Sequence, residues 1–260
     1  MGGPHGHTLS YHGHSPVHRA PAHVKIVATL LFVLAVVATP REAVWAFALH
    51  LLVLAVAIGV STVPLRHLLP RLVVEVPFLV FALLMPFVAT GPAVAVGPLE
   101  LSEPGLWGAW AIVVKGTLGA LASLLLASTT EAPDIVAGLA RLRLPQQLVQ
   151  ILAFMIRYVD VVAADLRRMR IARESRGFQG RSLAAWPVLA STAGALFIRS
   201  YERGERVHLA MLSRGYQGRL HLDEGGAVAP RTWSLALLAP TLAAAVALGA
   251  WLATSGPVSR

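Results

Sequence analysis

Five long apolar blocks restrict the folds open to this chain more than any other feature of its sequence. They span residues 24–39, 43–60, 72–90, 106–129 and 233–253, and each contains at most one charged side chain. A helix rises about 1.5 Å per residue, so blocks of this length approach or exceed the roughly 30 Å hydrocarbon core of a bilayer. A span must also satisfy its own backbone hydrogen bonds, which favours helices for uninterrupted apolar runs. The blocks predict an all-α integral membrane protein with about five transmembrane helices.

The composition agrees with this class. Hydrophobic residues make up 56% of the 260 residues and charged residues 13%, against about 25% charged in a typical soluble domain. The chain has no cysteine, which excludes a disulfide scaffold, a cysteine zinc site and a thiol nucleophile. Its net charge of +9 is typical of loops that face an anionic lipid leaflet, so we expect contact with membrane lipid and not with nucleic acid.

Changes in composition divide the chain into four parts. Residues 1–23 form a His-rich tail, 24–130 four transmembrane helices, 131–231 a charged region, and 232–260 the last transmembrane helix and the C-terminus. Pro77 and Pro86 predict a kink in the third apolar block. The segment between the third and fourth blocks, 91–105, is rich in Gly, Pro and Glu and is expected to be a loop.

Two long helices are predicted in the charged region, which holds 15 of the 22 Lys and Arg residues. The first covers 146–176, where apolar residues alternate at spacings of four and three and form one stripe. The stripe consists of Leu148, Leu152, Met155, Val159, Val162, Leu166 and Met169. The second helix covers 183–214, and its uncharged part at 183–198 leaves two interpretations open: a sixth span, or a helix at the membrane surface.

A repeated heptapeptide decides between these interpretations. SRGFQGR occurs at 175–181 and SRGYQGR at 213–219, and the copies differ only in Phe178 and Tyr216. A span at 183–198 would place the copies on opposite sides of the membrane, whereas near-identical peptides are expected to meet like partners in one compartment. We therefore predict two long helices at the cytoplasmic surface. With the N-terminus inside, 19 Lys and Arg residues lie inside and two outside, in agreement with the positive-inside rule.

Each copy is expected to close one of the long helices and to present an arginine at its tip. A glycine follows each arginine, where a left-handed residue commonly ends a helix. An alanine four residues before the arginine shares its face of the helix. A guanidinium in this position can bind a carboxylate or carbonyl groups of another protein. The residues predicted to make this contact are Ala172, Ser175, Arg176, Gly177, Ala210, Ser213, Arg214 and Gly215.

No motif in the sequence indicates catalysis. G-x-x-x-x-G-K-[ST], G-x-S-x-G and H-E-x-x-H patterns are absent, and no carboxylate pair within a span forms an acid–base couple. Lys115, inside the fourth block, has two interpretations. It is a functional intramembrane charge, or it lies near the outer end of the span and reaches the interface.

Six of the ten histidines lie in the first 23 residues. Imidazoles two residues apart around a glycine, as at His5 and His7 or His12 and His14, can share a borderline metal ion. No carboxylate or cysteine lies nearby to complete a coordination shell. We therefore assign no metal site, and these four histidines stay weak candidates.

The sequence resembles the transmembrane coupling subunit, or T component, of energy-coupling factor transporters. The two Ala-x-x-x-Arg-Gly helix ends are similar to the paired signature motifs of that family. The segment SPVHRAPAHVKIV, together with IRYVDVVAADLRRMRIARESRGF and RGERVHLAMLSRGY, is similar to the cobalt-type T component, CbiQ. The resemblance covers essentially the whole chain.

This resemblance implies a non-catalytic subunit of an ATP-driven importer in the bacterial inner membrane, with its N-terminus in the cytoplasm. It implies two cytoplasmic ATPase subunits that carry ATP and magnesium. It also implies a substrate-binding membrane subunit (S component) that carries the metal ion and that can be accompanied by a small accessory membrane subunit. Arg176 and Arg214 would each dock on one ATPase, and this chain would bind no cofactor. Cobalt is the first expected ion and nickel the second. An intramembrane enzyme and a stand-alone metal carrier are the alternatives.

Overall fold

The computed structural model describes residues 15–96, 99–178, 185–218 and 229–255, and its described part is almost entirely helical. The chain divides into two compact units. One unit, called the helix pair here, contains α8 (Gln146–Glu174) and α9 (Trp186–Leu212). The other, called the bundle, contains the remaining elements, and α7 (Ala132–Arg141) ends just beyond its boundary at Gly138.

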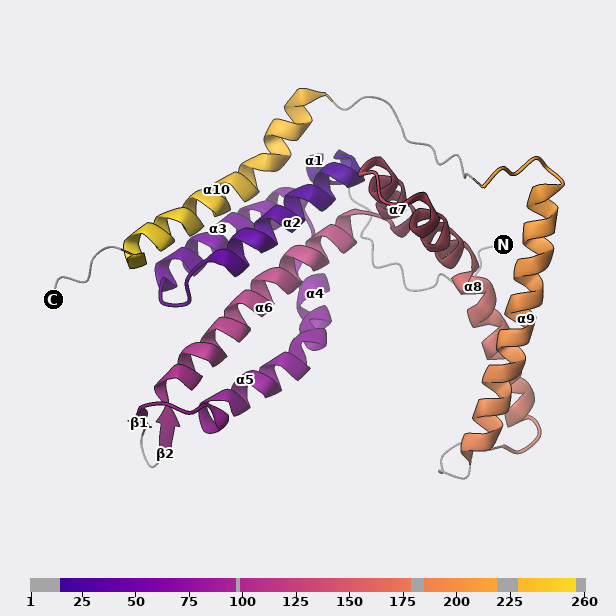
Figure 1. Cartoon of the computed structure of the whole chain (residues 1–260), viewed down its shortest axis with the longest axis horizontal. Helices are drawn as coiled ribbons and strands as arrows, with labels where there is room; N and C mark the ends of the chain where they lie inside the picture. The colour runs from indigo at the N-terminus through magenta and orange to yellow at the C-terminus, as the bar shows by residue number, and fades with distance from the viewer. Residues whose placement is uncertain (1–14, 97–98, 179–184, 219–228, 256–260) are drawn as a thin grey trace. The chain divides into compact units, whose positions relative to one another are not determined.

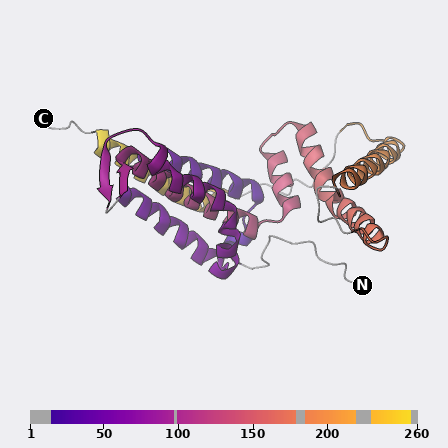
Figure 2. The same cartoon turned by 90° about the horizontal axis from the view of Figure 1, so that it is seen from below.

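The bundle is built from the apolar blocks (Figures 1 and 2). Its elements are α1 (Pro16–Arg19), α2 (Ala22–Ala38), α3 (Val44–Ser61), α4 (Leu65–Leu68), the 3-10 helix η1 (Leu69–Glu75), α5 (Val76–Val88), β1 (Ala93–Val96), β2 (Leu99–Ser102), α6 (Glu103–Thr129) and α10 (Pro230–Ser255). Helix α2 packs between α10 and α6, α3 contacts α10 and α6, and α5 lies along α6.

Close packing holds the bundle together. Phe32, Phe47, Leu54 and Leu118 are buried in one shared core. Along α10, Ala243, Ala247 and Ala250 are buried at spacings of four and three, so they face α2 and α3 on one side of the helix. Small residues at such a contact let helix backbones approach closely, which stabilises helix pairs in lipid, where the hydrophobic effect gives little drive.

The outer surface of the bundle is apolar, as a membrane requires. Along α5, large side chains such as Phe78, Leu83 and Val88 are 62%, 71% and 75% exposed. In water a patch of this size would promote aggregation, whereas hydrocarbon solvates it. Together with the helix lengths, this surface identifies a multi-pass membrane protein.

Five helices in the described part of the chain are long and apolar enough to span a bilayer: α3, the segment from α4 to α5, α6, α8 and α10. This agrees with the predicted number of spans. The five helices are not the five predicted blocks, however, because α8 is among them and α2 is not. Helix α2 has 17 residues and is shorter than these, although it packs inside the bundle with the other spans. Helix α8 is long and apolar enough to span, but its second half carries many charges. Helix α9 does not meet the same criterion.

Two local features differ from the sequence expectations. The predicted kink in the third block takes the form of the 3-10 helix η1, which ends before Pro77, while Pro86 lies inside α5. The expected loop at 91–105 contains the antiparallel hairpin β1–β2, with Ala93 paired to Ser102, and Figure 2 shows it beside one end of the bundle. A hairpin satisfies backbone groups that would otherwise be unpaired near the membrane.

Polar side chains in the bundle donate hydrogen bonds to carbonyl groups at helix ends. Lys25 Nζ donates to the Thr129 carbonyl at the end of α6, at 2.8 Å, and Lys115 Nζ donates to the Val37 carbonyl near the end of α2, also at 2.8 Å. Both carbonyls lie in the last turn of a helix, where intrahelical donors are missing and a cation is favoured. The contact of Lys115 with the end of α2 agrees with the interfacial interpretation of this lysine.

Candidate functional site

The two heptapeptide copies begin where α8 and α9 end. Their backbones make the same pattern of hydrogen bonds. Gly177 and Gly215 adopt φ values of 77° and 83°. The Gly177 N–H donates to the Glu174 carbonyl at 3.0 Å, and the Gly215 N–H donates to the Leu212 carbonyl at 3.0 Å. The next N–H groups, from Phe178 and Tyr216, reach back five residues to the carbonyls of Arg173 and Met211, at 3.1 and 3.0 Å. This bond pattern is a Schellman motif at both ends.

The serines of the two copies are matched as well. Ser175 Oγ donates to the Ala172 carbonyl and Ser213 Oγ to the Ala210 carbonyl, each at 3.0 Å. Each serine therefore satisfies a carbonyl in the last turn, and each exposed alanine leaves room beside the arginine. The structure thus brings the predicted residues together in two small constellations of the same form.

Arg176 and Arg214 are exposed at the helix tips. Neither side chain makes an ion pair or a side-chain hydrogen bond with any residue that the structure describes. Each lies beside the negative end of its helix dipole, which favours a cation there. Their guanidinium donors are therefore available to an acceptor on another molecule.

The aromatic residues after the glycines fold back onto the helices instead of extending outward. The Arg173 guanidinium lies over the Phe178 ring at 5.7 Å. Tyr216 packs edge-on against His208 at 6.4 Å, and its hydroxyl donates to Gln150 Oε1 at 2.8 Å. Both rings are half-buried. Each ring therefore packs against a side chain in the last turns of the helix that it follows, at the place where a Schellman motif usually makes such a contact.

Helices α8 and α9 run in opposite directions and cross each other (Figure 1). The start of α8 lies at the end of α9, because Gln150 contacts Tyr216, and the end of α8 lies near the start of α9, because Arg173 Nη1 donates to Thr192 Oγ1 at 3.2 Å. The Arg176 and Arg214 tips therefore lie at opposite ends of the helix pair.

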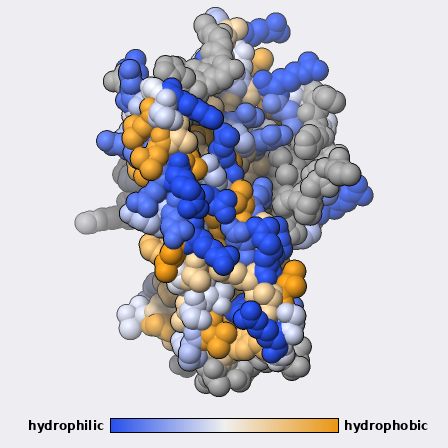
Figure 3. Space-filling view, turned by 90° about the vertical axis from the view of Figure 1, so that its right-hand side faces the viewer, coloured by the Kyte–Doolittle hydropathy of each residue, from blue (hydrophilic) through white to orange (hydrophobic). Residues whose placement is uncertain are grey.

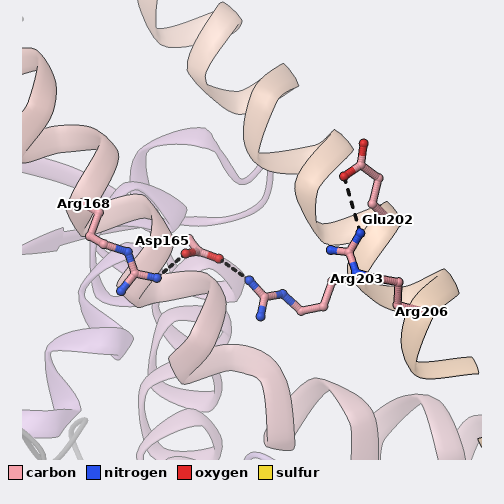
Figure 4. Close-up of polar contacts among 5 residues, drawn as sticks. All are labelled: Asp165, Arg168, Glu202, Arg203 and Arg206. Atoms are coloured by element: carbon pink, nitrogen blue, oxygen red, sulfur yellow. Dashed lines mark hydrogen bonds and ion pairs between the residues drawn. The ribbon is translucent and has the colours of Figure 1, made fainter. Parts of the chain in front are cut away.

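An ion-pair cluster joins the two helices between their ends (Figure 4). Asp165 Oδ2 accepts a hydrogen bond from Arg203 Nη2 on α9 at 2.9 Å, while Oδ1 accepts from Arg168 on its own helix. The Asp165 side chain is 12% exposed. The hydrogen bond from Arg168, together with the charges of Arg168, Arg203 and Arg199, lowers the pKa of Asp165, so the carboxylate stays charged at neutral pH.

An apolar groove of about 610 Å³ lies between the same helices. Its lining includes Ile151, Phe154, Val162, Val207 and Met211. Four of the seven residues of the predicted stripe on α8 are between 45% and 62% exposed: Leu148, Met155, Val159 and Leu166. Figure 3, which views the side on which Figure 1 draws α9, shows hydrophobic patches among hydrophilic residues.

The residues that hold the two helices together were not predicted. Asp165 and Arg203 lie within the segments similar to CbiQ, and Gln150 precedes them, but only their place opposite each other across two helices reveals their role. The candidate histidines His5, His7, His12 and His14 lie outside the described residues. Within the described part, no group of three or more His, Asp or Glu side chains could hold a metal ion.

Comparisons with known proteins agree with this arrangement. The family model CbiQ, cobalt transport protein, matches residues 13–223. An uncharacterized protein of Methanocaldococcus jannaschii, MJ1089, is 33% identical over 106 residues, which are 40% of each chain. The cobalt transport protein CbiQ of Rhodobacter capsulatus is 30% identical over 166 residues, 62% of this chain and 67% of that protein. The energy-coupling factor transporter transmembrane protein EcfT of Bacillus subtilis is 26% identical over 224 residues, 79% of this chain and 82% of that protein.

The match spans less than half the length of the first of these relatives, whereas the family model covers most of this chain. The bundle helices other than α10, and the two arginine-tipped helix ends, lie within the matched residues. The chain therefore belongs to the CbiQ family, cobalt transport protein, and is similar to energy-coupling factor transporter transmembrane proteins.

Proposed function

We propose that the chain is the coupling subunit of an ATP-driven importer for a transition metal ion, in which Arg176 and Arg214 each dock on one of two cytoplasmic ATPase subunits. The observation that carries this proposal is the matched geometry of the two tips. Both end in the same Schellman motif, both expose an arginine, and they lie at opposite ends of one helix pair. Two equal contacts set apart in this way fit two copies of one partner.

The chemistry of the tips supports a protein partner over lipid headgroups. Headgroup binding needs positive charge, but it needs neither the small alanine beside each arginine nor a fixed turn after it. A guanidinium held at a rigid helix end can make a bidentate contact with a carboxylate or with carbonyl groups in a groove. ATP and magnesium belong to the ATPase subunits in this proposal, and the present chain catalyses no reaction.

In this proposal the helix pair transmits the movement of the ATPases to the substrate-binding subunit. Closure of the ATPases on ATP binding displaces the tips, and the Asp165–Arg203 pair passes the displacement from one helix to the other. The exposed apolar stripe from Leu148 to Met169 receives a separate membrane subunit that binds the substrate. An uncovered stripe of this kind is common at surfaces where partners dock.

The transported ion is proposed to be cobalt first and nickel second. The relative from Rhodobacter capsulatus is named for cobalt, and the family description names the same ion. The ion is cargo of the substrate-binding subunit, so the specificity is a property of that chain. We place the protein in the bacterial inner membrane with its N-terminus in the cytoplasm, because this orientation puts 19 of the 22 Lys and Arg residues inside.

The double substitution Arg176→Ala and Arg214→Ala tests the proposal. In membranes that contain the complete transporter, we expect it to abolish co-purification of the ATPases or to separate ATP hydrolysis from metal uptake. The fold should be kept, because both side chains are exposed and make no described contact.

Arg206→Ala is the matched control. Arg206 is an exposed arginine on α9 whose 3.7 Å pair with Glu202 is of a kind that contributes little to stability. Uptake and ATPase association should be unchanged in this variant. Normal metal uptake in the double variant would contradict the proposed docking role.

A further inference from the structure

The two heptapeptide copies differ at one residue, and that residue changes how each tip is held. At the second copy, the Tyr216 hydroxyl donates to Gln150 Oε1 at 2.8 Å. The other end of the same amide, Gln150 Nε2, donates to the Gly218 carbonyl at 2.6 Å. One side chain near the start of α8 therefore binds the turn after α9 at two points.

The backbone of this turn is shaped for the contact. Gly218 has a φ of 81°, a left-handed conformation that a residue with a Cβ rarely adopts. The residue in this conformation, Gly218, is also the one whose carbonyl accepts the hydrogen bond from Gln150 Nε2. Tyr216 also packs against His208 on the last turns of α9, so its ring is fixed at two sides and its hydroxyl is aimed at α8.

The first copy lacks this connection because Phe178 has no hydroxyl. Its ring lies under the Arg173 guanidinium, and Arg173 makes one hydrogen bond to Thr192, at 3.2 Å. Among the described residues, which do not include Gly180, the counterpart of Gly218, the Arg176 tip thus reaches the other helix through the Arg173 side chain. The Arg214 tip reaches it through two hydrogen bonds to one amide, directly from the turn that follows the arginine.

We infer that Gln150 and Tyr216 form a tie that fixes the Arg214 tip to the start of α8, so that the two coupling tips are mechanically unequal. This inference rests on the proposed role of the tips as ATPase contacts. Movement of the Arg214 tip passes directly into the first turns of α8, whereas movement of the Arg176 tip has more freedom before it reaches α9. Gln150 acts in this scheme as a positioning residue, because it acts through the tip and touches no ATP or metal ion.

The sequence offers reciprocal variants for a test. Tyr216→Phe gives the second copy the residue of the first and removes only the hydroxyl. Gln150→Leu removes both hydrogen bonds at similar volume. Phe178→Tyr is the matched control, because it adds a hydroxyl to the copy whose ring lies under Arg173 instead of facing Gln150.

The chain has no cysteine, so it can be purified and spin-labelled at introduced cysteines alone before it is assembled with the other subunits. Gln147→Cys and Gln217→Cys place spin labels on two exposed positions at either side of the tie. In the complete transporter in lipid nanodiscs, we expect a narrow distance distribution in the otherwise unchanged chain. Tyr216→Phe and Gln150→Leu should broaden it, and Phe178→Tyr should leave it narrow.

Coupling gives the second readout. ATPase co-purification should persist in Tyr216→Phe, because Arg214 is still present, while metal uptake per ATP hydrolysed falls roughly two- to tenfold, the range of one net hydrogen bond. Loss of co-purification would instead mean that the hydroxyl contacts the ATPase and would overturn the tie.

The two proposals fail in different ways. Distance distributions that stay narrow in both Tyr216→Phe and Gln150→Leu overturn the tie, even if the arginine double variant is inactive. Normal uptake in that double variant overturns the docking role, while the distance measurement still decides whether the tie exists.

Discussion

At the end of α9, Gly215 holds a backbone conformation that other residues adopt only with strain. Its φ is 83°, and a Cβ built at this position would meet no atom within 4 Å. An added methyl group would therefore not clash, and any effect of Gly215→Ala comes from the left-handed conformation alone, which costs a residue with a Cβ about 1 to 2 kcal/mol.

We expect Gly215→Ala to loosen the Schellman motif and to weaken ATPase association without unfolding the bundle. Hydrogen exchange of the amides at the end of α9 measures the loosening. Gly194→Ala, also in α9 and also with open space around it, is the control. It should stabilise the helix by up to about 1 kcal/mol, since glycine is a poor residue in a helix interior. Equal exchange rates in the two variants would contradict a role for the left-handed turn.

The sequence predicted the turn at each helix tip, but it did not predict which residues the aromatic side chains contact. The order Ala, Ser, Arg and Gly determines a local turn, because each of these residues acts on backbone groups within five positions. Phe178 and Tyr216 act across helices, and their partners Arg173 and Gln150 are set by how α8 and α9 pack. Sequence spacing along one helix does not contain that information.

Among the elements, α8 and α9 are held together by few contacts, and Asp165 makes the central one. Its carboxylate joins Arg168 and Arg203. The hydrogen bond from Arg168 lowers the pKa of Asp165, so the native state favours the charged form. A depressed pKa contributes stability above the unfolded pKa, and this contribution is lost as the pH falls through the folded pKa. At neutral pH the contact is therefore fully present.

Asp165→Asn should loosen the helix pair at neutral pH. We expect a wider separation of labels placed on α8 and α9 and a small increase in hydrogen exchange, because a partly exposed ion pair contributes modestly. Asp160→Asn is the control, since Asp160 is an exposed carboxylate on the same helix without a described partner in α9. If both substitutions give the same separation as the unchanged chain, the contact does not join the helices.

The pattern of apolar residues predicted these elements to different degrees. The bundle helices and α8 follow from long apolar runs and a regular stripe, and their boundaries agree within a few residues for α6, α8, α9 and α10. The hairpin β1–β2 and the 3-10 helix η1 were missed. Both are short and depend on contacts with α5 and α6, so neither has a periodic signal of its own.

At the scale of the whole molecule, α7 is the element through which the chain passes from the bundle into the helix pair. Helix α7 precedes α8 in the chain and is packed against the bundle at Gly138. A Cβ at this position would lie 2.8 Å from the His23 backbone nitrogen and 3.1 Å from Ala22. The bundle boundary also falls directly after Gly138. Gly138 is thus both a point of close contact between α7 and α2 and the last bundle residue before the chain enters the helix pair.

Gly138→Ala should separate α7 from the start of α2. Backbone atoms cannot yield as a flexible side chain does, so the two helices must shift, which is expected to cost about 1 to 3 kcal/mol, as overpacking does. We predict a lower thermal unfolding temperature of the purified chain and a lower metal uptake per ATP hydrolysed, with the arginine tips and their ATPase contacts intact. Gly119→Ala in α6, where an added Cβ meets nothing within 4 Å, should leave the uptake unchanged and should not lower the unfolding temperature, since alanine is the better residue in a helix interior. A Gly138→Ala variant that unfolds and transports like the unchanged chain would mean that the close contact between α7 and α2 at Gly138 contributes neither to stability nor to coupling.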